Sequence, residues 1–182
     1  MSYRHIPAMP KEVEYYLNCR PGKICVDGTL GGCGHAMKIC ENILPDGLLI
    51  GIDQDMDAIT NAEKILAAYT SNIRLFHDNF IHLSDILSVL NIAAVDGILL
   101  DLGISLHQIK KSGRGFSFGA DEPLDMRMDV RNALTAHQVV NTYSEKQLAD
   151  IFFTYGEERF SRRMAKAIIE TRACTPIATS LE

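Results

Sequence analysis

Residues 25–39 read CVDGTLGGCGHAMKI, in which two apolar residues and an acid are followed directly by four glycines within seven positions. Glycines placed directly after a strand permit a tight turn, and they let a ligand lie against the backbone N–H groups at the start of the next helix. We therefore expect a β-strand over residues 23–28, followed by a ligand-binding turn and a helix.

The pattern continues along the chain and predicts an α/β fold. Three more short aliphatic segments, alternating with helical patterns, lie at residues 48–53, 73–78 and 96–103. This alternation is typical of βαβ units and a parallel sheet of about four strands. Pro10 opens a short helix before the first strand. Ile59, Ala62 and Leu66 share the apolar stripe of a helix between the second and third strands.

After residue 103 the rhythm changes to a segment rich in glycine and charge, followed by purely helical patterns. Ser144 and Gln147 have the spacing of a capping box, and we expect a helix over residues 158–173 with Phe160 and Met164 facing inward. We therefore divide the chain into a Rossmann-like domain, residues 1–120, and a small helical domain, residues 121–182. Four parallel strands leave a sheet edge unfinished, so we expect a longer protein.

Composition excludes several classes of protein. With 47% hydrophobic and 23% charged residues, the sequence is that of a soluble globular chain, and no apolar stretch is long enough to cross a membrane. The five cysteines show no metal-ligand or disulfide pattern, so we expect a reducing cytoplasmic location and no metal. The net charge of −5 does not indicate nucleic-acid binding, but a local basic patch is compatible with it.

The glycine turn and the acids after it predict the ligand. The glycine spacing does not fit G-x-G-x-x-G, the dinucleotide pattern, and a P-loop lysine is also missing. Asp53 ends the second strand, where an acid accepts hydrogen bonds from ribose hydroxyls. Phe80 follows the third strand and can pack on a base, and Asp101 lies at the carboxyl end of the fourth. The set suits an adenosyl ligand without phosphates, and S-adenosylmethionine is the candidate.

Simpler interpretations of the same residues stay open. The glycines can serve turn geometry alone, Asp53 and Asp101 can be helix caps, and Phe80 can be a core aromatic. Arg114, Arg127 and Arg131 would ordinarily be surface groups or partners of Asp125 and Asp129.

Several motifs resemble those of the bacterial small-subunit (16S) ribosomal RNA cytosine-N4 methyltransferases. In chain order they are HIPAM, VDGTLGGCGH, LIGIDQD, HDNF, DGILLDLGIS, RGFSF, PLDMRMD and YGEERFSRRMAKAI. The resemblance implies a class I methyltransferase sheet interrupted by a helical insertion, and an enzyme that transfers a methyl group from S-adenosylmethionine to a cytidine amine. It implies ribosomal RNA as partner, within the assembling 30S subunit, and leaves the oligomeric state open, a homodimer included.

The resemblance also implies the residues of the site. Cofactor contacts carried over by position are Cys33, Gly34, His35, Asp53, Phe80, Asp101 and Gln108. Asp101, or a carbonyl beside it, would orient the target amine or the cofactor amino group, which makes it the candidate catalytic residue. The chain departs from the family pattern at Cys33, where glycine is usual, at Leu106, where serine is usual, and at Lys110, where aspartate is common.

Other functions remain as alternatives at this point. The chain could be a non-catalytic fragment or paralogue that only binds the cofactor. It could be a nicotinamide-dependent oxidoreductase, in which Asp53 would bind a ribose of the dinucleotide. It could also be a methyltransferase that acts on a small molecule or a protein. For an RNA substrate, Lys110, Arg114 and Phe118 lie in one stretch after Asp101 and form a candidate RNA-facing lip. Its phenylalanines could equally anchor the loop to a core.

Overall fold

The computed structural model describes residues 7–182, which form two compact units, the first ending at His107 and the second spanning Gln108–Glu182. The predicted domain boundary, between residues 120 and 121, lies further along the chain and stays a prediction. None of the helices within residues 7–182 is long and apolar enough to cross a lipid bilayer.

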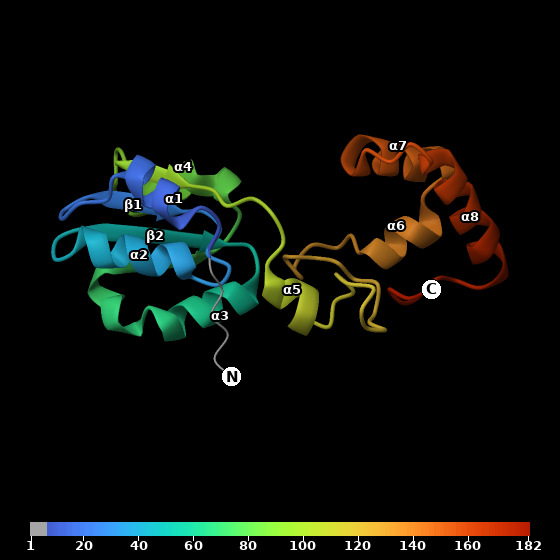
Figure 1. Ribbon diagram of the computed structural model, residues 1–182, viewed down its shortest axis with the longest axis horizontal. Helices are drawn as coiled ribbons and strands as arrows, with labels where there is room; N and C mark the ends of the chain where they lie inside the picture. Colours follow the sequence, from blue (N-terminus) through green and yellow to red (C-terminus); the bar gives the residue numbers. More distant parts are fainter. Residues whose placement is uncertain (1–6) are drawn as a thin grey trace. The chain divides into compact units, whose positions relative to one another are not determined.

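The first unit contains one parallel sheet in the strand order β3-β2-β1-β4 (Figure 1). The strands are β1 (Ile24–Asp27), β2 (Leu48–Asp53), β3 (Ile73–His77) and β4 (Gly97–Leu99). In the register of the sheet, Val26 lies between Ile50 and Ile98. The predicted α/β class and all four strands are confirmed.

The fourth strand is shorter than the predicted segment 96–103. Its pairing with β1 ends at Leu99, whose carbonyl accepts a hydrogen bond from the N–H of Gly28 at 2.9 Å. Two residues later, the N–H of Asp101 donates to the hydroxyl of Thr29 at 2.7 Å. The chain after Leu99 is therefore bound to the glycine turn and not to a neighbouring strand.

Helices cover both faces of the sheet. The helical elements of the first unit and of its junction with the second are α1 (Pro10–Leu17), α2 (Gly34–Ile43), α3 (Met56–Ile65), η1 (Ala67–Asn72), η2 (Phe80–His82), α4 (Leu83–Val89) and α5 (Leu106–Lys111). Cys25 and Leu49 face one core cluster, which α2 and α3 complete, whereas Val26 and Ile50 face another, completed by Ile86 of α4. This alternation buries the central strands β1 and β2 on both sides, as expected of a parallel sheet.

The second unit carries the helices α6 (Ala136–Thr142), α7 (Glu145–Gly156) and α8 (Ser161–Cys174). The predicted capping box is present, because the side chain of Ser144 accepts from the N–H of Gln147 and the Gln147 side chain accepts from the Ser144 N–H. Leu148 of α7 is buried against Ala165 of α8 in the core of this unit.

The predicted inward face of the last helix is only partly right, because Ile168 packs against the core of this unit but other predicted residues do not. Phe160 and Met164 are exposed, whereas Ser161 and Ala165 are buried. The buried stripe therefore begins one position later than predicted, at Ser161, and shares Ile168 with the predicted stripe. Small residues at the contact let α7 and α8 approach closely, and Ala149 and Ala165 supply them here.

Candidate functional site

Two glycines of the turn have no room for a side chain. A Cβ atom on Gly28 would lie 2.6 Å from the Cδ2 of Leu100, and one on Gly34 would lie 2.9 Å from the Cδ of Pro7. Gly31 has a positive φ of 45°, which favours glycine. The protein's own side chains and backbone therefore account for part of the glycine requirement.

Cys33 stands directly before α2 in the left-handed conformation, with φ 63° and ψ 17°. Its thiol is buried in the core cluster of α2, and the Asn61 side-chain amide donates to its sulfur at 3.8 Å. Burial raises the pKa of this thiol to about 12, which keeps it protonated near neutral pH. Cys33 thus adopts a glycine-like backbone while its side chain points into the core.

Asp53 fixes the turn from the end of β2. One carboxylate oxygen accepts from the N–H of Gly31 at 2.9 Å, and the other accepts from the N–H of Asp55 at 2.9 Å. Burial raises the pKa of Asp53, although these two hydrogen bonds act in the opposite direction. A carboxylate has about four lone-pair sites, so Asp53 keeps acceptor capacity for ligand hydroxyls.

Asp27, at the end of β1, is the residue that the sequence reasoning missed. It is fully buried, its Oδ1 accepts from the N–H of Thr29 at 3.1 Å, and its Oδ2 has no hydrogen-bond partner in the structure. Burial raises its pKa to about 7, and the negative charges of Asp53 and Asp101 act in the same direction. The signal in the sequence was the acid placed directly before Gly28.

Asp101 and His35 are far apart in the sequence, but their side chains lie close together in the structure. The Nε2 of His35 is 4.0 Å from the Oδ2 of Asp101. His35 is buried in the first turn of α2, whereas the Asp101 side chain is 41% exposed. Asp101 therefore combines a position beside the turn with access to molecules in solution.

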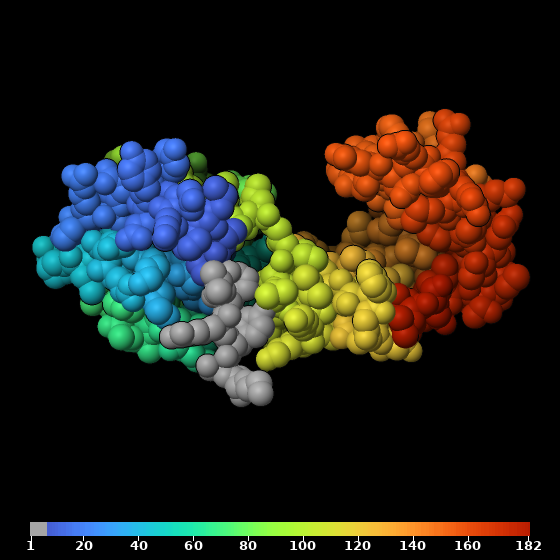
Figure 2. Space-filling view, in the orientation of Figure 1, coloured from blue at the N-terminus to red at the C-terminus, as the bar shows by residue number. Residues whose placement is uncertain are grey.

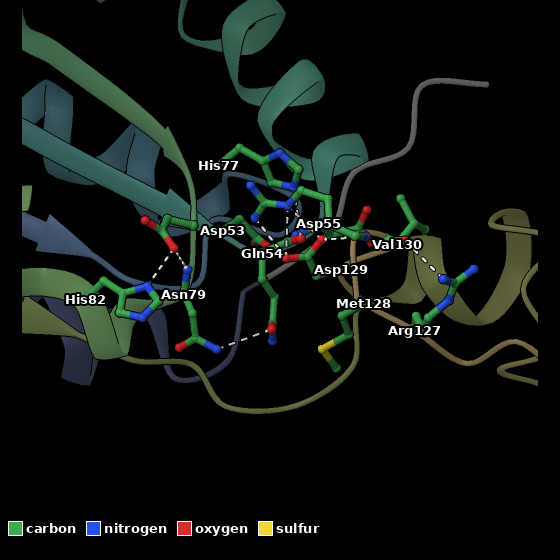
Figure 3. Close-up of polar contacts among 12 residues, drawn as sticks. Asp53, Gln54, Asp55, His77, Asn79, His82, Arg127, Met128, Asp129 and Val130 are labelled. Atoms are coloured by element: carbon green, nitrogen blue, oxygen red, sulfur yellow. Dashed lines mark hydrogen bonds and ion pairs between the residues drawn. The ribbon is translucent and has the colours of Figure 1, made fainter. Parts of the chain in front are cut away.

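The segment after β3 supplies a polar network next to Phe80. The side-chain oxygen of Asn79, Oδ1, caps η2 by accepting from the N–H of Ile81 at 3.1 Å. The Asn79 side-chain amide also donates to the side chain of Gln54 at 3.3 Å, and a ring nitrogen of His77 lies 3.1 Å from the Gln54 carbonyl oxygen (Figure 3). Phe80 is half-buried, and its Cβ lies close to Gly28.

The structure thus gathers six predicted site residues at the carboxyl end of the sheet in the first unit: Cys33, Gly34, His35, Asp53, Phe80 and Asp101. Gln108 is buried on α5 and belongs to the second unit, so its contribution stays a prediction. The close set of Asp27, Asp53 and Asp101 is strongly acidic. Such a site disfavours phosphate groups and favours a ligand that carries positive charge and hydroxyls.

Two arginines of the second unit pair with nearby aspartates. Arg127 forms a two-point ion pair with Asp125, its Nη2 lying 2.6 Å from Oδ2, and Arg131 pairs in the same way with Asp129 at 2.8 Å. The backbone carbonyl of Val130 also accepts from Arg127 at 3.0 Å (Figure 3). The interpretation as partners of nearby aspartates is confirmed for Arg127 and Arg131. The Arg114 guanidinium instead donates to the backbone carbonyls of Arg127 and Met128.

Comparison with known proteins gives matches over practically the whole chain. The model of the MraW methylase family matches residues 2–182. A protein named Ribosomal RNA small subunit methyltransferase H, from Desulforapulum autotrophicum, is 57% identical over 182 residues, which are 100% of this chain and 58% of that protein. The protein of the same name from Desulfosudis oleivorans is 52% identical over 180 residues, 99% of this chain and 58% of that protein.

The chain therefore spans 58% of the length of these curated relatives. Among solved structures, a methyltransferase homologue from Pyrococcus horikoshii is similar over 52% of this chain and 30% of that chain, with 24% identity and a TM-score of 0.44.

Proposed function

The chain belongs to the MraW methylase family, and from that premise we propose that it forms part of an S-adenosylmethionine-dependent methyltransferase acting on the N4 amine of a cytidine in small-subunit ribosomal RNA. The name shared by the relatives supports ribosomal RNA as the substrate class. We extend the proposal to a cytoplasmic enzyme that acts on RNA within the assembling 30S subunit.

The acidic turn is the observation that carries the proposed cofactor. Asp27 is fully buried with one oxygen unpartnered, and it lies in the field of Asp53 and Asp101. S-adenosylmethionine carries positive charge on its sulfonium and ammonium groups, and it has ribose hydroxyls but no phosphate. The residues present therefore fit this group. Membership of a methylase family also removes the alternative that the chain is a nicotinamide-dependent oxidoreductase.

We assign the cofactor contacts to the residues named from the sequence. Cys33, Gly34 and His35 form the turn at the start of α2, Asp53 would accept from the ribose hydroxyls, and Phe80 would pack beside the base. Gln108 of α5 is kept as a further proposed contact on the resemblance alone. When bound, S-adenosylmethionine supplies an electrophilic methyl group, so the protein's task is to hold the nucleophile in line with it.

Asp101 is the proposed catalytic residue. The exocyclic amine of cytosine is a weak nucleophile because its lone pair is delocalised into the ring. The carboxylate of Asp101 would accept a hydrogen bond from this amine, and it would stabilise the positive charge that develops on the nitrogen during methyl transfer. The exposure of the Asp101 side chain is compatible with the approach of a substrate base.

Calorimetric titration of the chain with S-adenosylmethionine tests the cofactor proposal. We expect binding by the parent chain and a loss of at least tenfold in affinity for Asp53→Ala, with Asp46→Ala as the control because Asp46 is an exposed acid of the same unit. Asp53→Asn keeps the shape of the residue and shows whether the charge is needed. No binding by a folded parent chain, or equal binding by Asp53→Ala, contradicts the proposed site.

The substrate is tested on a full-length relative with the residue that corresponds to Asp101 replaced by alanine. We expect methyl transfer to ribosomal RNA to fall by 100-fold or more, with cofactor affinity measured in parallel. If both turnover and cofactor affinity are retained, the role of Asp101 is wrong. If affinity alone is lost, Asp101 acts on the cofactor and not on the target amine.

A further inference from the structure

Two cysteine thiols lie in contact at the amino-terminal side of the sheet. The sulfur of Cys19 is 3.7 Å from the sulfur of Cys25. Cys19 lies in the connection between α1 and β1, whereas Cys25 is a residue of β1 itself. Because a disulfide bond is about 2 Å long, the two sulfurs need to approach by about 1.7 Å to form one.

The two cysteines differ in access and in freedom to move. Cys25 is completely buried, and its backbone is held between Leu49 of β2 and Gly97 of β4. Cys19 is only partly buried and lies outside the strands. The neighbouring α1 segment is at the surface of the first unit (Figure 2). A small oxidant therefore meets Cys19 first, and the connection around Cys19 supplies the movement.

The chemistry of the pair separates the roles of the two sulfurs. The two sulfurs share a hydrogen bond in which either S–H can be the donor, and once Cys19 is a thiolate the remaining S–H is that of Cys25. This hydrogen bond holds the pKa of Cys19 below its ordinary value, against the opposing effect of burial. The same hydrogen bond, together with burial, raises the pKa of Cys25. The thiolate is the reactive form of cysteine, so Cys19 is the nucleophile of the pair and Cys25 the resolving thiol.

We propose that Cys19 and Cys25 form a reversible intramolecular disulfide when the protein meets hydrogen peroxide. The Cys19 thiolate attacks one peroxide oxygen, giving a sulfenic acid and hydroxide. The sulfur of Cys25 then attacks the sulfur of Cys19, and its proton leaves with the sulfenic hydroxyl as water. The two thiols lose two electrons in total, and one peroxide molecule takes them up.

The other three cysteines provide internal comparisons. Burial raises the pKa values of Cys33 and Cys40 to about 12 each, which makes them poor nucleophiles. Cys174 is exposed at the end of α8 in the second unit, where it can form disulfides between molecules. A Cys174→Ser background removes that reaction and leaves the proposed pair unchanged.

The test is peptide mapping of the Cys174→Ser chain after treatment with hydrogen peroxide and alkylation of the remaining thiols. Trypsin cleaves after Lys23 and thereby separates Cys19 from Cys25. We expect peptides 12–23 and 24–38 to be recovered as one linked species, and dithiothreitol to separate them. The second peptide also holds Cys33, so fragmentation of the linked species identifies the cysteine used.

Variants make the outcome decisive. Cys40→Ser should retain the link, whereas Cys19→Ser should abolish it. Cys25→Ser should leave a Cys19 sulfenic acid that dimedone traps. Recovery of both Cys19 and Cys25 in alkylated form, under conditions that fully oxidise Cys174 of the parent chain, overturns the proposal. A link to Cys33, or oxidation of Cys19 to sulfinic acid without any link, also overturns it.

Discussion

Replacing Asp27 by asparagine should change how stability depends on pH. Asparagine has nearly the same shape and keeps an oxygen that can accept the Thr29 N–H, but it does not titrate. In the folded protein the pKa of Asp27 is about 7, compared with about 3.9 for an ordinary aspartate. Between these values, the folded state binds a proton that the unfolded state has released.

The sign follows from this difference. The raised pKa of Asp27 adds to the free energy of unfolding, and this contribution is fully present below about pH 4. It is lost as the pH rises through about 7. A shift of about 3 units corresponds to about 4 kcal/mol in total, of which about 3 kcal/mol falls between pH 5 and pH 8. The parent chain should therefore lose this stability over that range, while Asp27→Asn should not.

Urea unfolding of both proteins at several pH values from 5 to 8 measures the effect. The quantity of interest is the change with pH in the difference between their free energies of unfolding, because a constant offset reports only how well the amide is accommodated. The raised pKa of Asp53 contributes to both proteins and cancels to first order. Asp46→Asn, at an exposed position, should show no such change. A difference that stays constant from pH 5 to 8 would refute the assignment of a titrating, buried Asp27.

Three further predictions concern other parts of the chain. Cys33 has a φ of 63°, so the Cys33→Gly variant should be more stable than the Cys33→Ala variant by about 1 kcal/mol in urea unfolding, because alanine is strained in the left-handed conformation. Equal stability of the two variants would contradict this. Ser144→Ala removes the acceptor for the Gln147 N–H and should lower the stability of the second unit by about 1 kcal/mol. Thermal unfolding measures this effect, and an unchanged midpoint would mean that the cap is not needed. Phe118 is 88% exposed, so Phe118→Ala should weaken binding of a small-subunit RNA fragment by roughly fivefold or more without changing the stability of the protein. Phe116→Ala should instead lower the stability, because Arg114 covers the Phe116 ring. An unchanged RNA affinity of Phe118→Ala would remove Phe118 from the RNA-facing lip.

The sheet could be predicted from sequence because each buried strand is a short aliphatic segment bounded by turn residues. The segment around Leu99 shows the limit of this reasoning. Residues 96–103 remain aliphatic beyond the point where pairing stops, and only the hydrogen bonds to Gly28 and Thr29 reveal where the strand ends. Such contacts join residues about 70 positions apart, and no local pattern carries them.

The site shows the same division between local and long-range information. Asp53 was identified because a strand-end acid after a glycine turn has a recognisable spacing. Asp27 was not, because an acid before a glycine is common and only burial distinguishes this one. On α8, the helical spacing of the sequence allows either of two adjacent faces to be buried. Packing against Ala149 of α7 buries the face that carries Ser161 and Ala165.

The contact between Pro7 and Gly34 has a practical meaning for anyone who prepares this protein. The proline ring fills the space beside the first residue of α2, so Pro7 supplies one wall of the turn. Trimming that removes Pro7, or a bulky purification tag fused just before it, alters this wall. Affinities from preparations with different amino-terminal boundaries would then describe different sites, and a tag at the other end of the chain avoids the problem.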